Sequence, residues 1–254
     1  SFYHGIMITS LTNAKIKNFA RLSMKKDRDK TGLFLAEGIH MIEEARKAGI
    51  LQEVLQTESL PVLEGVPTEF CSRPVLDKLS SNKSGTDCIG VCRKPVHDKT
   101  DGSRILMLER VQDPGNVGTL IRSAYAFGAD LVILSEGCAD PWSAKALQSS
   151  KGAVFHIPVL SCPLTEKIQA LKEEGTEVFA TALHQDSVNL HNVQVPDKWA
   201  LVIGNEGQGL SSDVLQACTR SVFIEMQDFE SLNAAVAGSI ALYRFQFKNE
   251  GPSA

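Results

Sequence analysis

The sequence predicts an α/β protein of two domains, the second built around a mostly parallel sheet. Across the 254 residues, apolar strand-like runs alternate with helical patterns. One stretch, residues 94–103, lacks an apolar period but contains Pro95, Gly102 and four charged residues, which is typical of a linker. After it, the patterns follow the order of βαβ units, which build parallel sheets. Residues 1–6 precede Met7, a candidate start, and are left out of the fold prediction. The expected domains span residues 7–98 and 104–250.

The first domain is expected to alternate helices and strands. Ser10 and Thr12 can cap the first helix, in which Ile16 and Phe19 stand at helical spacing. Gly49 can end the second helix, because glycine adopts a left-handed conformation at little cost. Short apolar runs predict the strands between the helices. The predicted helices are residues 10–24, 39–48 and 73–79, and the predicted strands are residues 32–36, 51–56 and 88–92.

The second domain is expected to begin with a buried strand and a long helix. Val117, Leu120 and Ile121 lie on one stripe of this helix, and Gly128 ends it. If the helix begins at Asn116 or Val117, Asn116 is its cap. The predicted strands are residues 105–108, 131–134, 154–159, 178–182, 200–203 and 222–224. The further predicted helices are residues 142–150, 165–174, 211–218 and 232–248.

Charge is unevenly distributed along the chain. The formal net charge of −4 argues against a protein coated with nucleic acid over its whole surface. Residues 1–100 nevertheless carry three more Lys and Arg than Asp and Glu, whereas residues 101–254 carry seven fewer. A local basic patch can attract an anionic partner, although a solvated helix face is the common alternative. The clustered cations are Lys15, Lys17, Arg21, Lys25, Lys26, Arg28 and Lys30.

Cysteine and histidine spacing gives no indication of a metal site. The six cysteines form no CxxC pair, so reduced and mostly buried thiols are favoured over a zinc site or a disulfide framework. The six histidines show no spacing typical of a metal site or a catalytic triad. The sequence shows no signal-peptide pattern and no apolar run of membrane-spanning length. We therefore expect a cytoplasmic protein that binds no metal and no membrane.

Three polar segments follow predicted strands of the second domain. They read DPGNVGTLIR (residues 113–122), LVIGNEGQGL (residues 201–210) and IEMQDFESLN (residues 224–233). Because ligands of open α/β sheets bind at the carboxyl ends of strands, three such junctions predict one composite site. The GxxGxG spacing of the second segment matches neither the GxGxxG dinucleotide fingerprint nor a Walker loop, which disfavours a nicotinamide site. Such a loop still lets the backbone approach an adenine or methionine moiety.

Polar side chains within these segments are candidates for chemistry. Asn116 and Arg122 lie six residues apart on the predicted helix, with Arg122 off the apolar stripe. Each candidate also has an ordinary structural interpretation. Arg122 could be a solvated arginine, Glu206 a rim charge, and Ser231 and Asn233 helix caps. The final helix is rich in Ala, Gly and Ser, which permits close backbone packing either within the chain or across a dimer.

In this order and spacing, the three segments resemble the SpoU/TrmH family of RNA ribose 2′-O-methyltransferases in the SPOUT superfamily. They are similar to the family patterns P-x-N-x-G-x-x-x-R-(S/T)-A-x-A-F-G, G-N-E-G-x-G-(L/M) and I-P-M…S-L-N-x-(S/A)-V-A. Residues 140–159 are similar to a further family motif, and residues 34–38 resemble the L30e-like RNA-binding domain of larger members. Two residues depart from the patterns: Glu225 stands in place of a proline, and Gln148 in place of a common arginine.

The resemblance implies a trefoil-knotted SPOUT methyltransferase domain preceded by a smaller L30e-like α/β domain. It also implies S-adenosylmethionine as the cofactor and a homodimer whose active site draws on both chains. By motif match, the cofactor-binding residues would be Gly204, Ile224 and Leu232. The catalytic or substrate-orienting residues would be Asn116, Arg122, Glu206, Ser231 and Asn233. The candidates for RNA binding in the basic stretch are Lys15, Lys25, Lys26 and Arg28.

The activity that the resemblance implies is transfer of a methyl group to a ribose 2′-hydroxyl of RNA, and by the same resemblance the additional amino-terminal domain favours 23S-type ribosomal RNA. Positioning and charge placement should dominate, because this displacement needs little covalent help from the protein. A guanidinium, with a pKa above ~12, is a poor base, so Arg122 is expected to clamp phosphate and stabilise the developing alkoxide. The alternatives are a transfer RNA substrate, a non-catalytic RNA-binding or ribosome-assembly protein, and a nucleotide-dependent oxidoreductase, which the glycine spacing disfavours.

Overall fold

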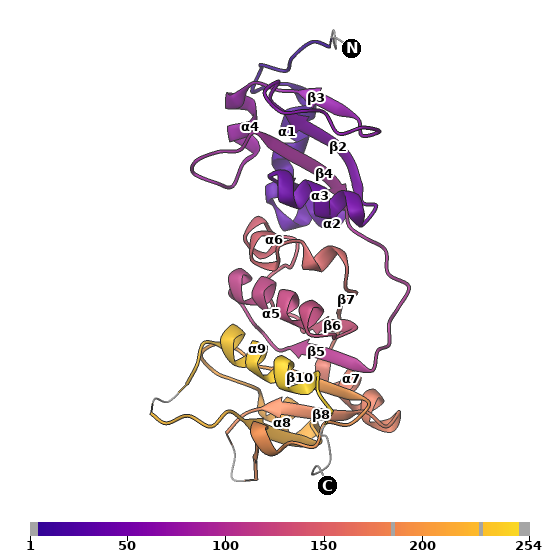
Figure 1. Cartoon of the computed structure of the whole chain (residues 1–254), viewed down its shortest axis with the longest axis vertical. Coiled ribbons are helices and arrows are strands. Elements are labelled where there is room, and N and C mark those ends of the chain that lie inside the picture. The colour runs from indigo at the N-terminus through magenta and orange to yellow at the C-terminus, as the bar shows by residue number, and fades with distance from the viewer. Residues whose placement is uncertain (1–4, 184–185, 229–230, 249–254) are drawn as a thin grey trace. The chain divides into compact units, whose positions relative to one another are not determined.

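The computed structural model describes residues 5–183, 186–228 and 231–248, and the chain divides into two compact units (Figure 1). The first unit comprises Ser1–Val96 together with Trp142–Leu147, and the second comprises His97–Pro141 together with Gln148–Ala254. The division after Val96 lies inside the predicted linker, which forms no helix or strand before Arg104.

The first unit is built on a four-stranded sheet of order β1-β4-β2-β3. The central strand β4 is antiparallel to both β1 and β2, whereas β2 and β3 run parallel. Alternate residues of β1, Phe34 and Ala36, are fully buried, whereas β4 is buried over five consecutive residues. The strands are β1 (Leu33–Glu37), β2 (Leu51–Gln56), β3 (Thr68–Phe70) and β4 (Cys88–Arg93). The helices are α1 (Ala14–Ala20), α2 (Lys25–Thr31), α3 (Ile39–Lys47) and α4 (Arg73–Leu79).

The predicted first helix, residues 10–24, begins later than expected: α1 starts at Ala14 and continues as a 3₁₀ turn over Arg21–Ser23, and the next helix, α2, was not predicted. Asn13, rather than Ser10 or Thr12, caps α1, since its side-chain oxygen accepts from two backbone N–H groups of the first turn at 2.9 and 3.3 Å. The chain breaks at Met24, which is extended, and α2 begins after it. At the break the Arg28 guanidinium donates to the carbonyl oxygens of Leu22 and Ser23, at 3.0 and 3.1 Å. The sequence KKDRDKT of α2 has no apolar stripe, so periodicity could not predict this helix.

The second unit contains a seven-stranded sheet within its described residues, of order β7-β6-β5-β10-β8-β11-β9. Every neighbouring pair is parallel, which confirms the predicted architecture. Strands β6 and β10 are buried at every position, as expected for strands covered on both faces. The strands are β5 (Arg104–Leu108), β6 (Leu131–Leu134), β7 (Val159–Ser161), β8 (Glu177–Thr181), β9 (Val188–Asn189), β10 (Trp199–Ile203) and β11 (Arg220–Phe223).

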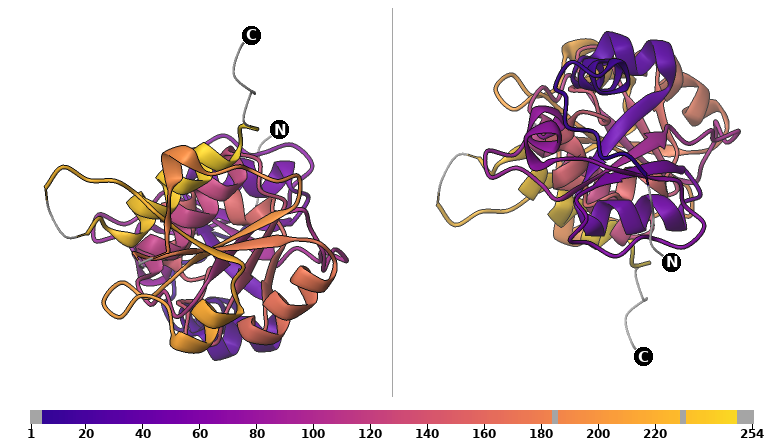
Figure 2. Two further views of the ribbon diagram at one scale, coloured as in Figure 1. Left: turned by 90° about the horizontal axis from the view of Figure 1, so that it is seen from below. Right: turned by 90° about the horizontal axis from the view of Figure 1, so that it is seen from above.

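Helices cover both faces of this sheet (Figure 2). Helices α7 and α8 pack on one face, where Ile168 and Val214 join a core with alternate residues of the strands. Helices α5 and α9 pack together over the other face. The helices are α5 (Pro114–Ala126), α6 (Ala144–Ser150), α7 (Leu164–Glu173), α8 (Ser212–Ala217) and α9 (Ala234–Phe245). Within the described residues, no helix is long and apolar enough to cross a membrane.

The predicted strand at residues 154–159 was wrong. Residues Ala153–Phe155 form a 3₁₀ turn that follows Gly152, whose φ of 82° is left-handed. Strand pairing begins only beyond Pro158, which has no N–H to give to a neighbouring strand. The apolar run VFHIPV therefore supplies a buried turn and the start of the short edge strand β7, rather than one strand.

The small residues of α9 pack within the chain. A Cβ on Gly238 would lie 2.4 Å from Cδ2 of Leu120 on α5, so glycine permits the close approach of the two helices. The hydroxyl groups of Ser239 and Ser123 also form a hydrogen bond, at 2.6 Å. Leu242 and Phe245 of α9 are buried as well, whereas five other apolar side chains of this segment are exposed. These residues, called the apolar stripe below, are Leu232, Val236, Ile240, Tyr243 and Phe247.

Candidate functional site

The three polar segments meet at the carboxyl edge of the parallel sheet. A cavity of about 820 Å³ lies there, between the loop that follows β10 and the start of α9. Gly204, Ile224 and Leu232, the three expected cofactor residues, all line it. Ile203 and Met226, from the second and third segments, add apolar surface to its lining. Leu183 and Leu190 also line it, although no sequence motif indicated them.

A more polar hollow of about 650 Å³ adjoins this cavity. Glu206, Ser231 and Leu232 line both spaces, so the two are continuous at these residues. Asn116 and Asn233 line only the polar hollow. Four of the five expected catalytic residues therefore lie beside the cavity, contributed by α5, the loop after β10 and the segment before α9.

The loop of residues 204–209 is held by its own backbone and by Asn205. The backbone N–H groups of Asn205 and Gly209 donate to each other's carbonyl oxygens, at 3.1 and 2.9 Å. The Asn205 side-chain oxygen accepts from the N–H groups of Gly207 and Gln208, both at 3.0 Å. These bonds close the segment into a tight loop whose backbone faces the cavity.

Gly204 is required by the shape of this loop. A Cβ placed on it would lie 2.4 Å from the carbonyl carbon of Gly209 and 2.6 Å from the nitrogen of Leu210. Real Cβ atoms do not approach backbone so closely, so the loop returns across Gly204 only because the residue has no side chain. The sequence pointed to close approach of a ligand, whereas the structure shows close approach of the loop's own chain.

Helix α5 begins earlier than expected, at Pro114, and Asp113 is its cap. The Asp113 side chain accepts from the N–H of Asn116 at 3.0 Å, and proline suits the first helical position because its missing N–H would be unpaired there. The expectation that Asn116 caps the helix was wrong. Its side chain points instead into the polar hollow.

A chain of hydrogen bonds joins the three polar segments. The Asn233 amide donates to the side-chain oxygen of Asn116 at 3.2 Å, and the Asn116 amide donates to Glu206 at 3.4 Å. Asn233 also caps α9, accepting from the N–H groups of Ala235 and Val236 at 2.9 and 3.1 Å. The cap interpretation of Asn233 is therefore right, and the same side chain still contributes to the site.

Glu206 ties the glycine-rich loop to the segment before α5. Its carboxylate accepts from the backbone N–H groups of Gln112 and Asp113, at 3.3 and 3.0 Å. Partial burial acts to raise the pKa of Glu206, but hydrogen bonds from the backbone and from Asn116 outweigh it and lower the pKa below its ordinary value. Glu206 is thus a charged acceptor near neutral pH.

Arg122 is the one catalytic candidate that does not lie at the site within a single chain. It lies exposed on α5 and lines neither the cavity nor the polar hollow. Within the described part of the chain its guanidinium has no hydrogen-bond or ion-pair partner.

The basic stretch of the first unit divides into paired and unpaired cations. Lys15 donates to Glu53 and Glu69 at 2.8 and 3.2 Å, and these bonds raise its pKa although burial opposes them. Lys25 pairs with Asp29 at 2.6 Å, and Arg28 is 5% exposed. The exposed cations of residues 15–30 that have no hydrogen-bond or ion-pair partner in the described chain are Lys17, Arg21, Lys26 and Lys30. Three of them, Lys17, Arg21 and Lys26, line one hollow of about 530 Å³.

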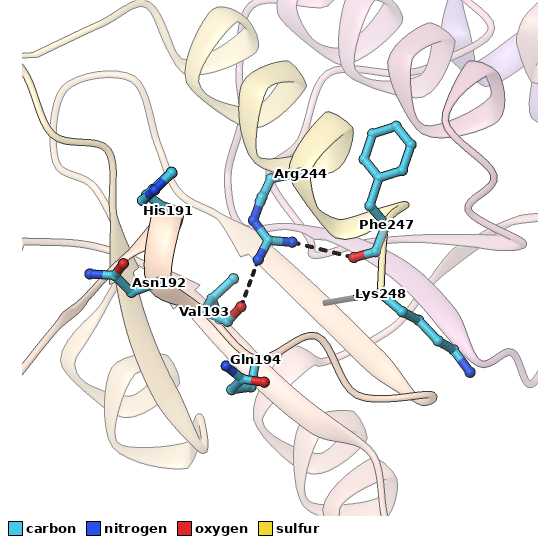
Figure 3. A pocket seen from close by; sticks show the side chains of 7 residues that line it. All are labelled: His191, Asn192, Val193, Gln194, Arg244, Phe247 and Lys248. Atoms are coloured by element: carbon cyan, nitrogen blue, oxygen red, sulfur yellow. Dashed lines mark hydrogen bonds between the residues drawn. The ribbon is translucent and has the colours of Figure 1, made fainter. Parts of the chain in front are cut away.

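Another hollow, of about 590 Å³, lies between α9 and the segment before β10 (Figure 3). The Arg244 guanidinium crosses it and donates to the carbonyl oxygens of Val193 and Phe247, at 2.8 and 3.3 Å. Lys248 on its rim pairs with Asp197. These contacts fasten the end of α9 to the preceding loop and indicate a structural role. Among the described residues, no three His, Cys, Asp or Glu side chains gather as metal ligands would.

Comparison with known proteins agrees with this geometry. The SpoU rRNA Methylase family matches residues 103–243, and the MRM3-like substrate binding domain matches residues 13–90. The chain is 36% identical over 245 residues to the 23S rRNA (guanosine(2553)-2'-O)-methyltransferase RlmP of Bacillus subtilis, covering 94% of this chain and 98% of the relative.

Solved structures give the same result. An RNA 2'-O ribose methyltransferase superposes with a TM-score of 0.81 at 31% identity, covering 94% of this chain and 98% of the other. The AdoMet-bound rRNA methyltransferase of Sinorhizobium meliloti superposes with a TM-score of 0.82 at 28% identity, covering 95% and 97%. The chain belongs to the SpoU rRNA methylase family.

Proposed function

We propose that this protein transfers a methyl group from S-adenosylmethionine to a ribose 2′-hydroxyl of ribosomal RNA. The observation that carries the proposal is the cavity at the carboxyl edge of the sheet with the Asn233–Asn116–Glu206 chain beside it. Family membership supports the reaction, and the names of the relatives support ribosomal RNA over transfer RNA.

The cavity suits the cofactor in size and in chemistry. Its volume of about 820 Å³ lies within the roughly 300–1,000 Å³ typical of small-molecule sites. Ile203, Ile224 and Leu232 offer apolar surface, while the loop after β10 offers backbone N–H and C=O groups. Gly204, Ile224 and Leu232 would contact S-adenosylmethionine, which supplies an electrophilic methyl group.

The polar hollow would orient the ribose. Asn116, Ser231 and Asn233 offer amide and hydroxyl groups where a nucleotide would enter beside the cavity. Glu206, whose pKa is lowered, is a weak base, so its role is to hold Asn116 and the adjoining backbone in place. Positioning of this kind accounts for much of the barrier reduction in bimolecular displacements.

A homodimer would bring an arginine to the polar hollow, where a single chain places none of the expected cations. Arg122 lies on α5, the helix that packs beside α9, and the exposed apolar stripe of α9 offers the surface that two subunits would bury. We infer that Arg122 of the partner subunit reaches the polar hollow, clamps an RNA phosphate and stabilises the developing alkoxide. The proposal also includes the trefoil knot and the L30e-like character of the first domain.

RNA would bind on the first unit through the cations that have no partner. Of the four candidates predicted from the sequence this proposal keeps only Lys26, because Lys15, Lys25 and Arg28 are engaged within the unit. The cations that join Lys26 are Lys17, Arg21 and Lys30. The match of residues 13–90 to a substrate binding domain supports this assignment. The six cysteines, all free, suit a cytoplasmic protein.

The proposal is tested by incubating the protein with labelled S-adenosylmethionine and either ribosomal or transfer RNA. Incorporation of label into ribosomal RNA alone is the expected result. Label in transfer RNA alone would favour the transfer RNA alternative. Absence of label from every RNA, in a protein that binds RNA tightly, would favour a non-catalytic RNA-binding role and overturn the proposal.

A further inference from the structure

Arg110, which follows the carboxyl end of β5, has a backbone conformation that residues other than glycine rarely adopt. Its φ is 49°, in the left-handed region, where a Cβ crowds the following carbonyl. Glycine would occupy this position at less cost. Strain of this kind persists where the surrounding structure holds the residue, and it gathers at functional sites.

Two backbone hydrogen bonds hold Arg110 in this conformation. Its N–H donates to the hydroxyl of Ser135 after β6, at 2.9 Å, and its carbonyl accepts from the Asn205 amide at 2.8 Å. Asn205 is the residue that organises the loop lining the cavity. The strained backbone of Arg110 is therefore bonded directly to the cofactor loop.

The Arg110 side chain contacts the same loop a second time. Its guanidinium donates to the side-chain oxygen of Gln208 at 2.9 Å. Gln208 lines the cavity, whereas Arg110 does not. Gln208 is exposed. Within the described residues it forms two hydrogen bonds, one from its backbone N–H to Asn205 and one from Arg110 to its side chain.

We propose that Arg110 is a positioning residue, which holds Gln208 and the tip of the 204–209 loop in the conformation that receives the cofactor. This inference rests on the proposed function. Holding the loop before binding reduces the ordering that binding must otherwise supply, so Arg110 raises cofactor affinity without touching the cofactor.

The test compares Arg110→Gly and Gln208→Ala, measuring dissociation constants for S-adenosylhomocysteine by calorimetry and melting temperatures without ligand. Arg110→Gly removes the guanidinium while keeping a residue that favours left-handed φ. We expect a roughly 3- to 10-fold weaker affinity, as for the loss of one ordinary hydrogen bond, because the contact orders the loop and does not touch the cofactor. The melting temperature should stay constant or rise. KM for S-adenosylmethionine should increase, with kcat at saturation unchanged.

The double variant and a matched control complete the test. If both residues act through one contact, Arg110→Gly with Gln208→Ala should bind no more weakly than either single variant. Lys151 is the other non-glycine residue with left-handed φ, 52°, among the described residues, so Lys151→Gly relieves similar strain away from the loop. It should leave affinity unchanged.

Two outcomes would overturn the inference. The first is unaltered affinity in both single variants, and the second is a lower melting temperature with affinity unchanged, which indicates a purely structural contact. If Arg110→Gly fails to fold, Arg110→Asn decides instead, because asparagine also tolerates left-handed φ and lacks the guanidinium. Failure of the unaltered protein to bind S-adenosylhomocysteine is a different result, which would overturn the proposed function itself.

Discussion

Gly204 shows how a single residue shapes the cofactor cavity. The return of the loop across this residue leaves no space for a Cβ, so Gly204→Ala should already distort the loop, and Gly204→Val more so. We expect a loss of stability of about 1–3 kcal/mol, as for overpacked sites, together with loss of S-adenosylhomocysteine binding by calorimetry.

Gly207 in the same loop provides the control. The atom nearest to a Cβ there is the Asn205 side-chain oxygen, at 3.7 Å, which is an ordinary contact. Gly207→Ala should therefore fold and bind normally. Normal binding by Gly204→Val would show that this loop does not form the cofactor site.

Arg122→Ala should reduce methyl transfer by at least about 10²-fold, as expected when a group that stabilises transition-state charge is removed. Affinity for S-adenosylhomocysteine should hardly change, because Arg122 does not line the cavity. Thr119→Ala, another exposed change on α5, should retain turnover. Near-normal turnover of Arg122→Ala would remove Arg122 from the mechanism.

The ionised Glu206 makes the stability of the protein depend on pH in the acid range. Because its folded-state pKa is lowered from 4.5, its contribution to stability is present above the unfolded pKa and is lost as the pH falls through the folded value. Glu206→Gln should therefore flatten the dependence of melting temperature on pH at acid pH, from the ordinary range of a glutamate downward. Parallel pH profiles for the two proteins would contradict the ionised role.

At this scale the motifs predicted four of the five side chains that were expected to meet, because each motif follows the end of a parallel strand, and Arg122 is the exception. They did not predict that Asp113 caps α5, although Pro114 at the first helical position is a readable signal for it. The apolar residues Leu183 and Leu190 line the cavity from outside the three motifs, so no local pattern could indicate them.

At the scale of elements, the turn between α1 and α2 is the proposed RNA contact. Changing Lys17, Arg21 and Lys26 together to Ala should weaken RNA binding and lower the salt slope by roughly 0.7–0.9 for each phosphate that is no longer neutralised. Cofactor affinity should not change. Filter binding across a salt series measures both effects.

The matched control removes the same number of cations from elsewhere in the first unit. Arg46, Lys47 and Lys78 each bond to an acceptor within the unit, so their joint change to Ala should leave the salt slope intact. Equal slopes for both triple variants and the unaltered protein would place the RNA contacts elsewhere.

Elements were predicted well where local sequence decides their structure. Residues 51–56 and 73–79 form β2 and α4 with the predicted bounds, since an apolar run and a proline at the helix start mark them clearly. Helix α2 and strands β3 and β9 were not predicted, because α2 has no apolar stripe and the two strands have only three and two residues.

At the scale of the whole molecule, the apolar stripe of α9 should join two subunits. Ile240→Glu would place a charge in the centre of a buried interface, so we expect monomers by light scattering and loss of methyl transfer. Gln169→Glu, an exposed change on α7 across the sheet, is the control. A dimeric and active Ile240→Glu protein would contradict the proposed interface.

The order of strands in the second sheet could not be read from local patterns. Strand β10 pairs with β5, which is far from it in sequence, and with β8 on its other side. The pairing of β5 with β10 brings the first two polar segments together. Periodicity gives strands and helices, but such long-range pairings depend on the whole chain. The motif resemblance supplied the expectation that these segments form one site.

Mapping of the product tests the central proposal most directly. Ribosomal RNA incubated with the protein and S-adenosylmethionine can be cleaved by alkali, which requires a free 2′-hydroxyl at each cleaved position. We predict a single new position resistant to alkali, present with the unaltered protein and absent with Asn116→Ala. Methyl groups found only on bases, or no new resistant position, would contradict the account.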